Sequence, residues 1–492
     1  MKKILFVLAV ILQGTLCAQE SGFYFTRPIG MGSYAVEIGD GEFIINSKNY
    51  WGESLMPSSL IKISNQGELL REVQLGDNYT EVTCLYQDSD EGVLYAVGCQ
   101  WDYQREYMDP FIASFDYDLN ILGWENISDI PIPYTTINDA KAIVNDRGKV
   151  LLVLSSFSEL YYLVFDLNGT LESFCSDPHL CCYVGSLCLM QDGSGDFGHY
   201  REQPGMVRIT EQLEMEPLFD VNLLQESQWM GSDTIHSVFV SPSRYPTVLP
   251  LTDSTFLFAE ETVEFWWDHY HPTSYCNDEN TAFFKCDSDG AVVNCILVDT
   301  RNDTLERPAY YKAMDLQYRG FVYLCSFQHL EHSSSGSEIG QNNIILMKAD
   351  PDLNLIWERR YCLGSICHKP LHILATGDGG CLITGYLSRD GTSDGLFALK
   401  LNMDGTLETR DTDVGVFPYR FYPNPVTNEL CVEFLPDVTP QAVELYDIQG
   451  HLVRSQVDAL GCINMEHLPI GTYTLRIAMS GGKVFSEKVV KQ

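Results

Sequence analysis

The sequence is poor in basic residues. Its 492 residues include 31 Lys and Arg against 67 Asp and Glu, which gives a formal net charge of -36, and no cluster of Lys or Arg stands out along the chain. Such an acidic surface repels phosphate groups and anionic lipid headgroups. The composition therefore argues against a partner made of nucleic acid and against binding to a membrane surface.

Long apolar runs are equally scarce. The run at residues 4–12 follows two lysines and precedes the small residues of 14–18. It is too short to span a bilayer as a helix, and its order of charge, apolar core and small residues is typical of a secretory signal peptide. We predict a signal peptide at residues 1–18, export through the periplasm, and no transmembrane segment.

Several motifs of common catalytic and metal centres are missing. No two of the 16 cysteines have CxxC spacing, and neither an HExxH nor a P-loop pattern occurs. A carboxylate pair for glycoside hydrolysis is available only from the acids at Glu261, Glu264 and Asp268, whose separation in space the sequence does not define. The sequence therefore predicts no catalytic residues.

What the sequence does contain is one unit written about seven times between residues 30 and 411. Each unit has an Asp/Gly turn between two apolar strands, a polar-aromatic loop, and a second Asp/Asn/Gly turn between two further strands. Turns of this composition close tight hairpins. The second turn and its flanking strands occupy residues 61–69, 112–122, 163–171, 207–215, 283–292, 346–357 and 398–407. Four antiparallel strands per repeat are the pattern of a β-propeller blade.

We therefore predict an all-β chain with a β-propeller over residues 19–411, of seven blades, with six or eight as alternatives. The fourth unit, near residues 182–221, has no recognisable first turn. Residues 23–27 form an extra strand ahead of the first unit, and we expect this strand to pair with the last blade and close the ring. Runs such as 150–154 are almost continuously apolar, as expected where both faces of a sheet are buried.

The loops between the second and third strands of the units are rich in aromatic residues and hold four of the seven tryptophans. In a propeller these loops share one face. Flat aromatic rings beside polar side chains suit a carbohydrate or an extended peptide. The alternative is that the loops bury these rings among themselves. We predict a ligand-binding aromatic loop face made of Tyr50, Trp51, Trp101, Tyr103, Tyr107, Tyr200, Trp266, Trp267, His269, Tyr270 and His271.

Metal sites are the weaker interpretation of some of these residues. His269 and His271 form an HxH pair with Cys276 and Asp278 nearby, but zinc needs three or four ligands in fixed geometry. The Asp-rich second turns, at residues 287–290 and 350–354, have residue types that calcium prefers, although such residues first of all make hairpin turns. We expect no cofactor, with zinc or calcium as the alternative.

The chain changes character after a linker at residues 412–420. Short β-rich runs separated by PNP, QG, PIG and SGG turns over residues 421–492 predict a small antiparallel, immunoglobulin-like β-sandwich. Within it, Cys431 and Cys462 either bridge two strands or remain as two buried thiols.

The same segment closely resembles the type A sorting domain of the type IX secretion system of Bacteroidetes. The resemblance includes Tyr422, Pro423, Asn424, Pro425, Gly450, Pro469, Gly471, Tyr473 and Lys488. It implies recognition by the type IX translocon at the outer membrane and removal by a sortase of the cysteine-peptidase class. The resemblance also implies that the protein is then released or attached to surface lipopolysaccharide. Upstream, residues 379–407 resemble units of a secreted bacterial propeller repeat family.

These observations together predict a secreted or cell-surface, noncatalytic propeller that binds a glycan or a protein. Two alternatives stay open. One is a propeller-fold glycosidase or polysaccharide lyase, and the other is a structural or assembly protein of the cell surface.

Overall fold

The computed structural model describes most of the chain. The described residues are 22–27, 30–48, 50–51, 54–55, 57–76, 79–102, 107–127, 130, 139–156, 159–178, 184–201, 205–220, 227–229, 234–240, 246–252, 254–268, 275–298, 305–317, 320–329, 342–363, 367–389, 392–407, 419–422, 426, 428–434, 440–447, 450–454, 462–479 and 484–491. The predicted signal peptide and residues 412–418 of the predicted linker lie outside them. Within the described part, no helix has the length and apolar character needed to cross a membrane.

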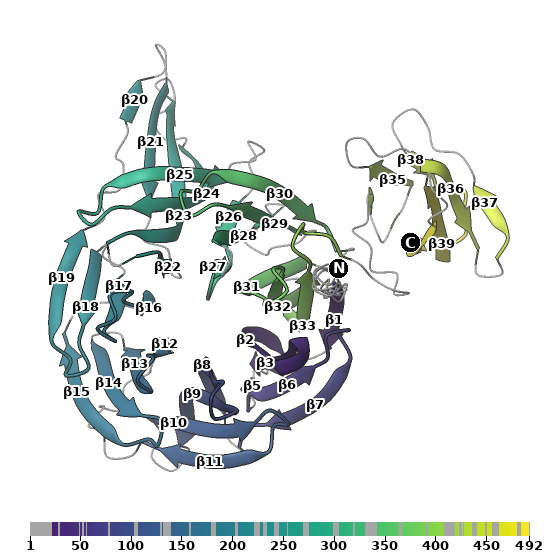
Figure 1. Cartoon of the computed structure of the whole chain (residues 1–492). Coiled ribbons are helices and arrows are strands. Elements are labelled where there is room, and N and C mark those ends of the chain that lie inside the picture. Colours follow the sequence, from purple (N-terminus) through teal and green to yellow (C-terminus); the bar gives the residue numbers. More distant parts are fainter. Residues whose placement is uncertain are drawn as a thin grey trace, which may run out of the picture.

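Seven antiparallel sheets stand around a common axis and account for the repeat (Figure 1). From the innermost strand outwards, the first blade consists of β2 (Met31–Ile38), β3 (Glu42–Lys48), β6 (Ser59–Ile63) and β7 (Leu69–Gln74), and the second consists of β8 (Thr80–Asp88), β9 (Val93–Asp102), β10 (Tyr107–Asp116) and β11 (Ile121–Asn126). The third blade consists of β12 (Asp139–Val144), β13 (Lys149–Ser155), β14 (Leu160–Asp166) and β15 (Leu171–Asp177). The fourth consists of β16 (Ser186–Leu189), β17 (Phe197–Arg201), β18 (Gly205–Ile209) and β19 (Met215–Asp220).

The remaining three blades follow the same order. The fifth blade consists of β22 (Thr247–Pro250), β23 (Phe256–Asp268), β24 (Tyr275–Cys286) and β25 (Val292–Val298), and β21 (Thr234–Val240) pairs with β23 and carries β20 (Ser227–Trp229) at its other edge. In the sixth blade, β26 (Leu305–Pro308) and β27 (Met314–Gln317) both pair with β28 (Phe321–His329), which is followed by β29 (Asn342–Ala349) and β30 (Leu355–Tyr361). The seventh blade consists of β31 (Cys367–Ala375), β32 (Cys381–Arg389), β33 (Thr392–Leu401) and β1 (Phe23–Arg27). A 3-10 turn, η1 (Gly39–Gly41), and a small hairpin of β4 (Tyr50–Trp51) and β5 (Ser54–Leu55) complete the ring.

The ring is closed. Each innermost strand contacts the next in the order β2, β8, β12, β16, β22, β27, β31, and β31 contacts β2 again. The predicted β-propeller is therefore confirmed, and the described residues form seven blades.

The closing strand comes from the other end of the sequence. β1 pairs antiparallel with β33, from Phe23 opposite Lys400 to Arg27 opposite Leu396. The last blade thus takes three strands from residues 367–401 and its outermost strand from residues 23–27. This confirms the expected pairing: β1 takes the outermost place in the seventh blade.

The hydrophobic core lies between the blades. On β13, Val150, Leu152 and Leu154 pack toward the second blade, whereas Leu151 and Val153 pack toward the fourth. Both faces of each sheet are thus removed from water, which is why the strands are continuously apolar instead of alternating.

The second turns share one hydrogen-bonding pattern. A side-chain oxygen at the first position accepts backbone N–H groups two or four residues later, as Asp350 does from Asp352 and Asn354. The fourth position has positive φ in all seven: Gly67, Leu119, Gly169, Leu213, Gly290, Leu353 and Gly405. A leucine there costs about 1 kcal/mol or more, and burial of Leu119 and Leu353 offsets this cost. The aspartates first considered for calcium are thus engaged by backbone donors.

The fourth blade corrects part of the repeat assignment. Its first turn does exist, at residues 190–196, between β16 and β17. Phe197, His199 and Tyr200 therefore lie in the second strand of the blade, and not in the loop that follows it. The assignment was wrong because the strand that follows the turn QDGSGD has the sequence FGHYR and lacks the continuous apolar run of the other second strands.

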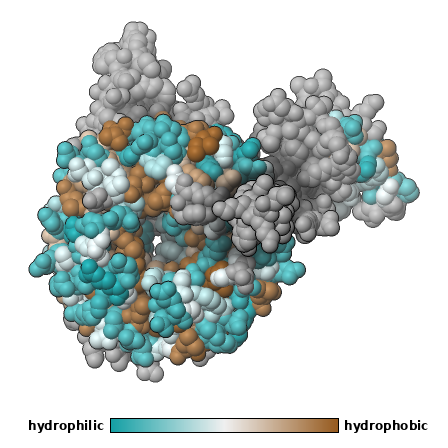
Figure 2. Space-filling view, in the orientation of Figure 1, coloured by the Kyte–Doolittle hydropathy of each residue, from teal (hydrophilic) through white to brown (hydrophobic). Residues whose placement is uncertain are grey.

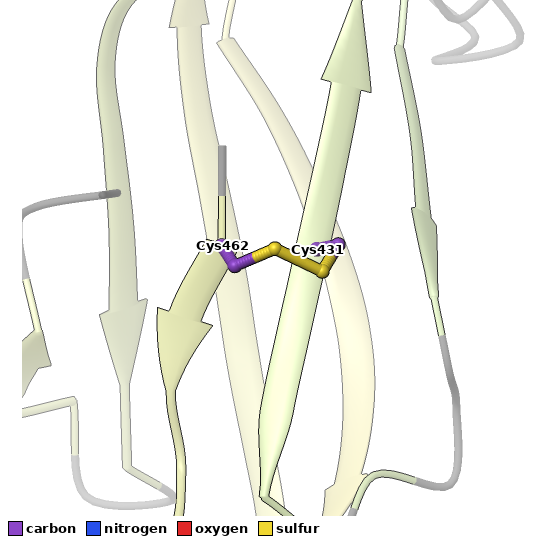
Figure 3. The surroundings of a disulfide bond; sticks show 2 residues. All are labelled: Cys431 and Cys462. Carbon is purple, nitrogen blue, oxygen red and sulfur yellow. A yellow bond between two sulfur atoms is a disulfide. The ribbon is translucent and has the colours of Figure 1, made fainter. Parts of the chain in front are cut away.

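The C-terminal strands form two small sheets, as predicted for a sandwich. One sheet is β34 (Tyr419–Tyr422), β35 (Glu429–Phe434), β38 (Cys462–Asn464), and the other is β37 (Leu452–Arg454), β36 (Pro440–Tyr446), β39 (Gly471–Met479), β40 (Val484–Lys491). They enclose a core of their own that includes Leu430, Leu445 and Leu475. Cys431 and Cys462 are direct cross-strand neighbours and are joined by a disulfide (Figure 3), which decides between the two alternatives.

Candidate functional site

The innermost strands surround a channel at the centre of the ring. The face of the ring seen in Figure 2 carries hydrophilic residues with separate hydrophobic patches among those that are coloured, and it is hollowed at its middle. In a propeller this is where side chains from all blades converge.

Three innermost strands carry a β-bulge that re-aims a polar side chain. The register shifts between Gly32 and Tyr34 in β2, between Val82 and Cys84 in β8, and between Pro370 and His372 in β31. A bulge inserts one residue and so changes the direction of the next side chain, and bulges are common beside functional sites. Tyr34, Cys84 and His372 are the residues that follow these bulges.

The sixth blade contributes through a crossing segment. Between β26 and β27, residues 309–313 bulge away from β28 and run beside β31, while Ala309 and Ala313 at the ends of the segment still hydrogen-bond to Cys325 of β28. The N–H groups of Tyr311 and Lys312 donate to the carbonyl of Leu371 at 2.7 and 3.1 Å, and the N–H of Ile373 donates to the carbonyl of Lys312 at 3.0 Å. This backbone pairing holds Tyr311 and Lys312 next to His372.

The rings of three of these residues are in contact. Tyr34 and Tyr311 are stacked, with centroids 5.5 Å apart and an interplanar angle of 16°. The ring of His372 meets Tyr34 edge-on, with centroids 5.8 Å apart. Tyr34 and Tyr311 are half-buried, whereas His372 is 5% exposed. The two tyrosines thus present aromatic surface from a platform that the first, sixth and seventh blades hold together.

Charged side chains from the second and third blades lie near this aromatic platform. Glu81 forms an ion pair with Lys48 and accepts a hydrogen bond from the Tyr79 hydroxyl at 3.0 Å. Asp139 accepts the backbone N–H groups of Ala140 and Val184, each at 3.0 Å. Each charge therefore has a defined position.

Burial governs the protonation of the cluster. It raises the pKa of Tyr34 well above its usual value, with further contributions from Tyr311 and Asp139. Burial raises the pKa of the Cys84 thiol to about 12, so this cysteine is not a thiolate nucleophile at neutral pH. The pKa of His372 is lowered well below its usual value by burial and by Lys312. At neutral pH the site therefore presents neutral phenols and a neutral imidazole.

This neutral imidazole makes stability sensitive to acid. The unfolded chain takes up a proton at His372 near pH 6.5, but the folded chain does so only at lower pH. The associated stability is present above about pH 6.5 and is lost as pH falls toward the lowered pKa. We expect His372→Phe to reduce the loss of stability between pH 7 and pH 5, measured by urea unfolding. His467→Gln, which changes an exposed histidine outside the ring, is the control and should leave the urea unfolding of the ring unchanged; an unchanged profile for His372→Phe would contradict the assignment.

Most of the predicted aromatic loop face is not described at the level of side chains. Tyr103, His269, Tyr270 and His271 lie outside the described residues. For five others the structure describes the backbone: Tyr50 and Trp51 in β4, Tyr107 in β10, Trp266 and Trp267 in β23. Trp266 of β23 is the cross-strand neighbour of His236 on β21 and of Cys276 on β24. The aromatic loop face thus stays a prediction at these positions.

Tyr200 and Trp101 have described side chains. Tyr200 is 1% exposed, and its ring lies 4.8 Å from that of Phe258 in the core between the fourth and fifth blades. The prediction that Tyr200 lines a binding surface is therefore wrong, because its side chain is buried in the core between two blades. Trp101 is half-buried against the core of the second and third blades. Its backbone N–H donates to the carbonyl of Tyr79, which lies two residues before Glu81.

The other acidic candidates from the sequence are described only in part. Glu261 lies 3.8 Å from Arg307, and the side chains of Glu264 and Asp268 are outside the described set. Among the described residues no group of three His, Cys, Asp or Glu is arranged to hold a metal ion. The sequence GTSDG at residues 391–395 fits the pattern of a serine-hydrolase elbow, but Ser393 pairs with Ser388 in the hairpin of β32 and β33 and not in a strand-to-helix turn.

The sorting residues occupy structural positions in the C-terminal sheets. Gly450 has a φ of 83°, and Gly471 begins β39. Tyr473 is 5% exposed and its hydroxyl donates to the carbonyl of Pro469 at 2.6 Å. Tyr422 lies in β34, and Lys488 pairs with Thr474. Residues 423–425 lie outside the described part.

The fold therefore defines a seven-bladed β-propeller with a polar, aromatic channel, joined in sequence to a small β-sandwich. Residues 420–492 match the family model of the secretion system C-terminal sorting domain. The chain thus carries a type IX sorting domain and is cargo exported by that system to the cell surface or the extracellular space. No curated protein matches the chain.

Solved structures resemble the chain at low identity. A structure described as the AfRom2 CNH domain has a TM-score of 0.40 and 11% identity, covering 78% of this chain and 98% of its own. BamB from Moraxella catarrhalis has a TM-score of 0.36 and 8% identity, covering 76% and 100%. Polysaccharide lyase Uly1 has a TM-score of 0.40 and 9% identity, covering 76% and 90%. The fold assignment rests on the sheet topology of the chain itself.

Proposed function

We propose that the exported ring is a carbohydrate-binding protein whose ligand enters the central channel. The observation that supports this most is the stacked pair of Tyr34 and Tyr311, half-buried and bordered by Glu81, Asp139 and Lys312. Sugars combine apolar ring faces with hydroxyl groups, so they bind where aromatic surface adjoins hydrogen-bonding side chains.

The predicted aromatic loops extend the same site. Strand directions put the start of β8 and the end of β9 at one edge of the second blade, since Thr80 is opposite Gln100. Glu81 and Trp101 therefore belong to the same end of the ring. Trp266 and Trp267 lie near the end of β23, the second strand of the fifth blade, as Trp101 lies near the end of β9 in the second blade, so the topology brings them to that end as well. An oligosaccharide longer than the channel is deep would contact these loops.

Tyr311→Ala tests the channel site. We expect it to weaken binding of oligosaccharides by roughly tenfold, because one aromatic stacking contact is worth about 0.5–1.5 kcal/mol beyond the area it buries. The ligand is first identified on an array of defined plant, bacterial and host oligosaccharides, and affinities are then measured by titration calorimetry.

Tyr86→Ala is the matched control. Tyr86 is also half-buried on an innermost strand and packs on another tyrosine, Tyr95, at 6.3 Å, but it lies toward the opposite end of β8. Its loss should leave affinity unchanged. The proposal is rejected if the wild-type ring binds no oligosaccharide, or if Tyr311→Ala and Tyr86→Ala lower the affinity equally.

We further propose that the sorting domain is removed by a sortase once the ring reaches the surface, and that the ring is released or attached to lipopolysaccharide. The match of residues 420–492 to a sorting domain supports this step. The measurement is the mass of the exported protein. A mass that includes these residues means that the sorting domain is retained, a mass without them in the medium means release, and a mass without them but with an added glycolipid means attachment.

A further inference from the structure

Among the described residues of the innermost strands, two buried polar side chains have no hydrogen-bond partner. They are Lys141 of β12, through Nζ, and His372 of β31, through Nδ1, and the residues are 6% and 5% exposed. A neutral imidazole leaves one nitrogen unsatisfied, whereas a lysine ammonium leaves three donors. Because an unpartnered buried charge is far more costly than an unpartnered neutral group, Lys141 is the stronger indication of a ligand.

Lys141 lies at the inner edge of the ring. Side chains alternate along a strand, and Ala140 belongs to the core between the second and third blades, so Lys141 and Asp139 lie on the side of the fourth blade. Asp139 accepts the N–H of Val184 there. Lys141 nevertheless interacts electrostatically with Glu260 of the fifth blade. Since the fourth blade stands between the third and the fifth, Nζ lies beside the channel and not deep between two blades.

The carboxylates around Lys141 are engaged by other groups. Asp139 and Glu260 act on the lysine electrostatically, but neither hydrogen-bonds to its Nζ. Both oxygens of Asp139 accept backbone N–H groups, and Glu260 hydrogen-bonds with the hydroxyl of Tyr200. Burial lowers the pKa of Lys141, and the two acids offset this only in part. The ammonium therefore needs an acceptor that the described part of the fold does not supply.

The same lysine is close to the aromatic platform. Asp139 acts electrostatically on both Lys141 and Tyr34, and Tyr34 stacks on Tyr311. The stem of a lysine is flexible, so Nζ can turn toward a ligand in the channel while β12 stays in place. A sugar whose ring lies on the two tyrosines can therefore direct a substituent to Nζ.

From this placement we infer that the glycan of the channel is acidic, and that a carboxylate or sulfate group of its sugar pairs with Nζ of Lys141. The inference rests on the proposed carbohydrate binding and names the class of sugar. An anionic oxygen supplies the acceptor that the ammonium lacks, and hydrogen bonds between two charged groups are shorter and stronger than those between neutral groups.

The excess of acidic residues in the chain opposes this pairing only weakly. Neighbouring strands of a sheet lie about 4.8 Å apart, so the outermost strand of a blade is roughly 14 Å from the innermost one. The Debye length is about 8 Å at physiological ionic strength, so charges on the outer strands are largely screened from the channel. Within the channel, Glu81 is already paired with Lys48.

Paired oligosaccharides test the inference. Oligouronates are compared with their carboxyl-reduced forms, and sulfated oligosaccharides are compared with their desulfated forms. We expect the full chain to bind one acidic series roughly 10- to 100-fold more tightly than its neutral form, as expected for a hydrogen bond to a charged group. Titration calorimetry measures the affinities, and the series that shows the preference identifies the anionic group.

Lys141→Met assigns the preference to the lysine. It should lower the affinity for the acidic form to that for the neutral form and leave the affinity for the neutral form unchanged. Because an apolar side chain replaces an unpartnered buried charge, the urea midpoint of the ring should stay the same or rise. Lys149→Met is the matched control and should keep the preference, since Lys149 pairs with Glu172 and begins β13, whose other end pairs with Asp139.

The outcomes separate this inference from the proposed function. Equal affinities of the wild type for acidic and neutral forms overturn the inference and leave carbohydrate binding in place. A Lys141→Met variant that weakens both forms alike, or that lowers the urea midpoint, also overturns it, because the lysine would then support the channel wall and not recognise the charge. A chain that binds neither form rejects the carbohydrate proposal itself, and this inference with it.

Discussion

A chain that lacks residues 420–492 should remain in the periplasm, and its amount at the cell surface should fall to that of a strain without the secretion system. The deleted part has its own core, formed by residues 426–489, so its loss leaves every core contact of the ring in place. The expected defect is therefore in export and not in folding. Fractionation followed by immunoblotting measures it, and the trapped ring should still melt cooperatively.

Two substitutions sharpen this experiment. Leu475→Asp buries a carboxylate in the core of the sorting domain, where Leu475 is fully buried, and should block export as the deletion does, because an unpaired buried charge is strongly destabilising. Leu452→Asp changes a leucine that is 50% exposed and should be exported normally. Surface display that survives both the deletion and Leu475→Asp would show that another segment directs export.

Phe23→Ala should lower the free energy of unfolding of the ring by about 3–4 kcal/mol, the usual loss for a buried phenylalanine. Phe23 is 4% exposed and begins β1, the strand that closes the ring. Its ring lies 5.9 Å from Phe43 of the first blade and packs in a cluster with Leu382 and Leu396 of the seventh. One side chain thus joins the first and last blades.

Urea unfolding of the ring is the measurement. Leu70→Ala, on the outermost strand of the first blade where Leu70 is 47% exposed, is the control and should change the free energy by less than about 0.5 kcal/mol. A loss below about 1 kcal/mol for Phe23→Ala would mean that the ring does not depend on this closure.

Local sequence was sufficient to predict the repeat and its turns. Asp116, Asp166, Asp287 and Asp350 start tight turns because their carboxylates accept nearby backbone N–H groups, an interaction within five residues that needs no tertiary contact. Residues 23–27 were recognised as the closing strand because they precede the first unit without a hairpin partner of their own.

The channel site was not predictable in the same way. Tyr34, Glu81, Asp139, Tyr311 and His372 come from five blades, and none belongs to a motif. Three bulges and the crossing segment at residues 309–313 bring them to one place. A bulge depends on the register between two strands, which the sequence of a single strand does not reveal. The sequence predicted an aromatic loop face, but one of its residues, Tyr200, lies in a strand and in the core.

The amino-acid sequence by itself determined that this is an exported, all-β chain of repeated hairpin units with a sorting domain at its end. These properties follow from short-range patterns: apolar strands, side-chain-stabilised turns and the residues of the tail. Tertiary structure alone decided the closure of seven blades and the contents of the channel. Closure of the ring brings together residues that the chain separates by hundreds of positions, and only packing between blades decides which of them face the channel.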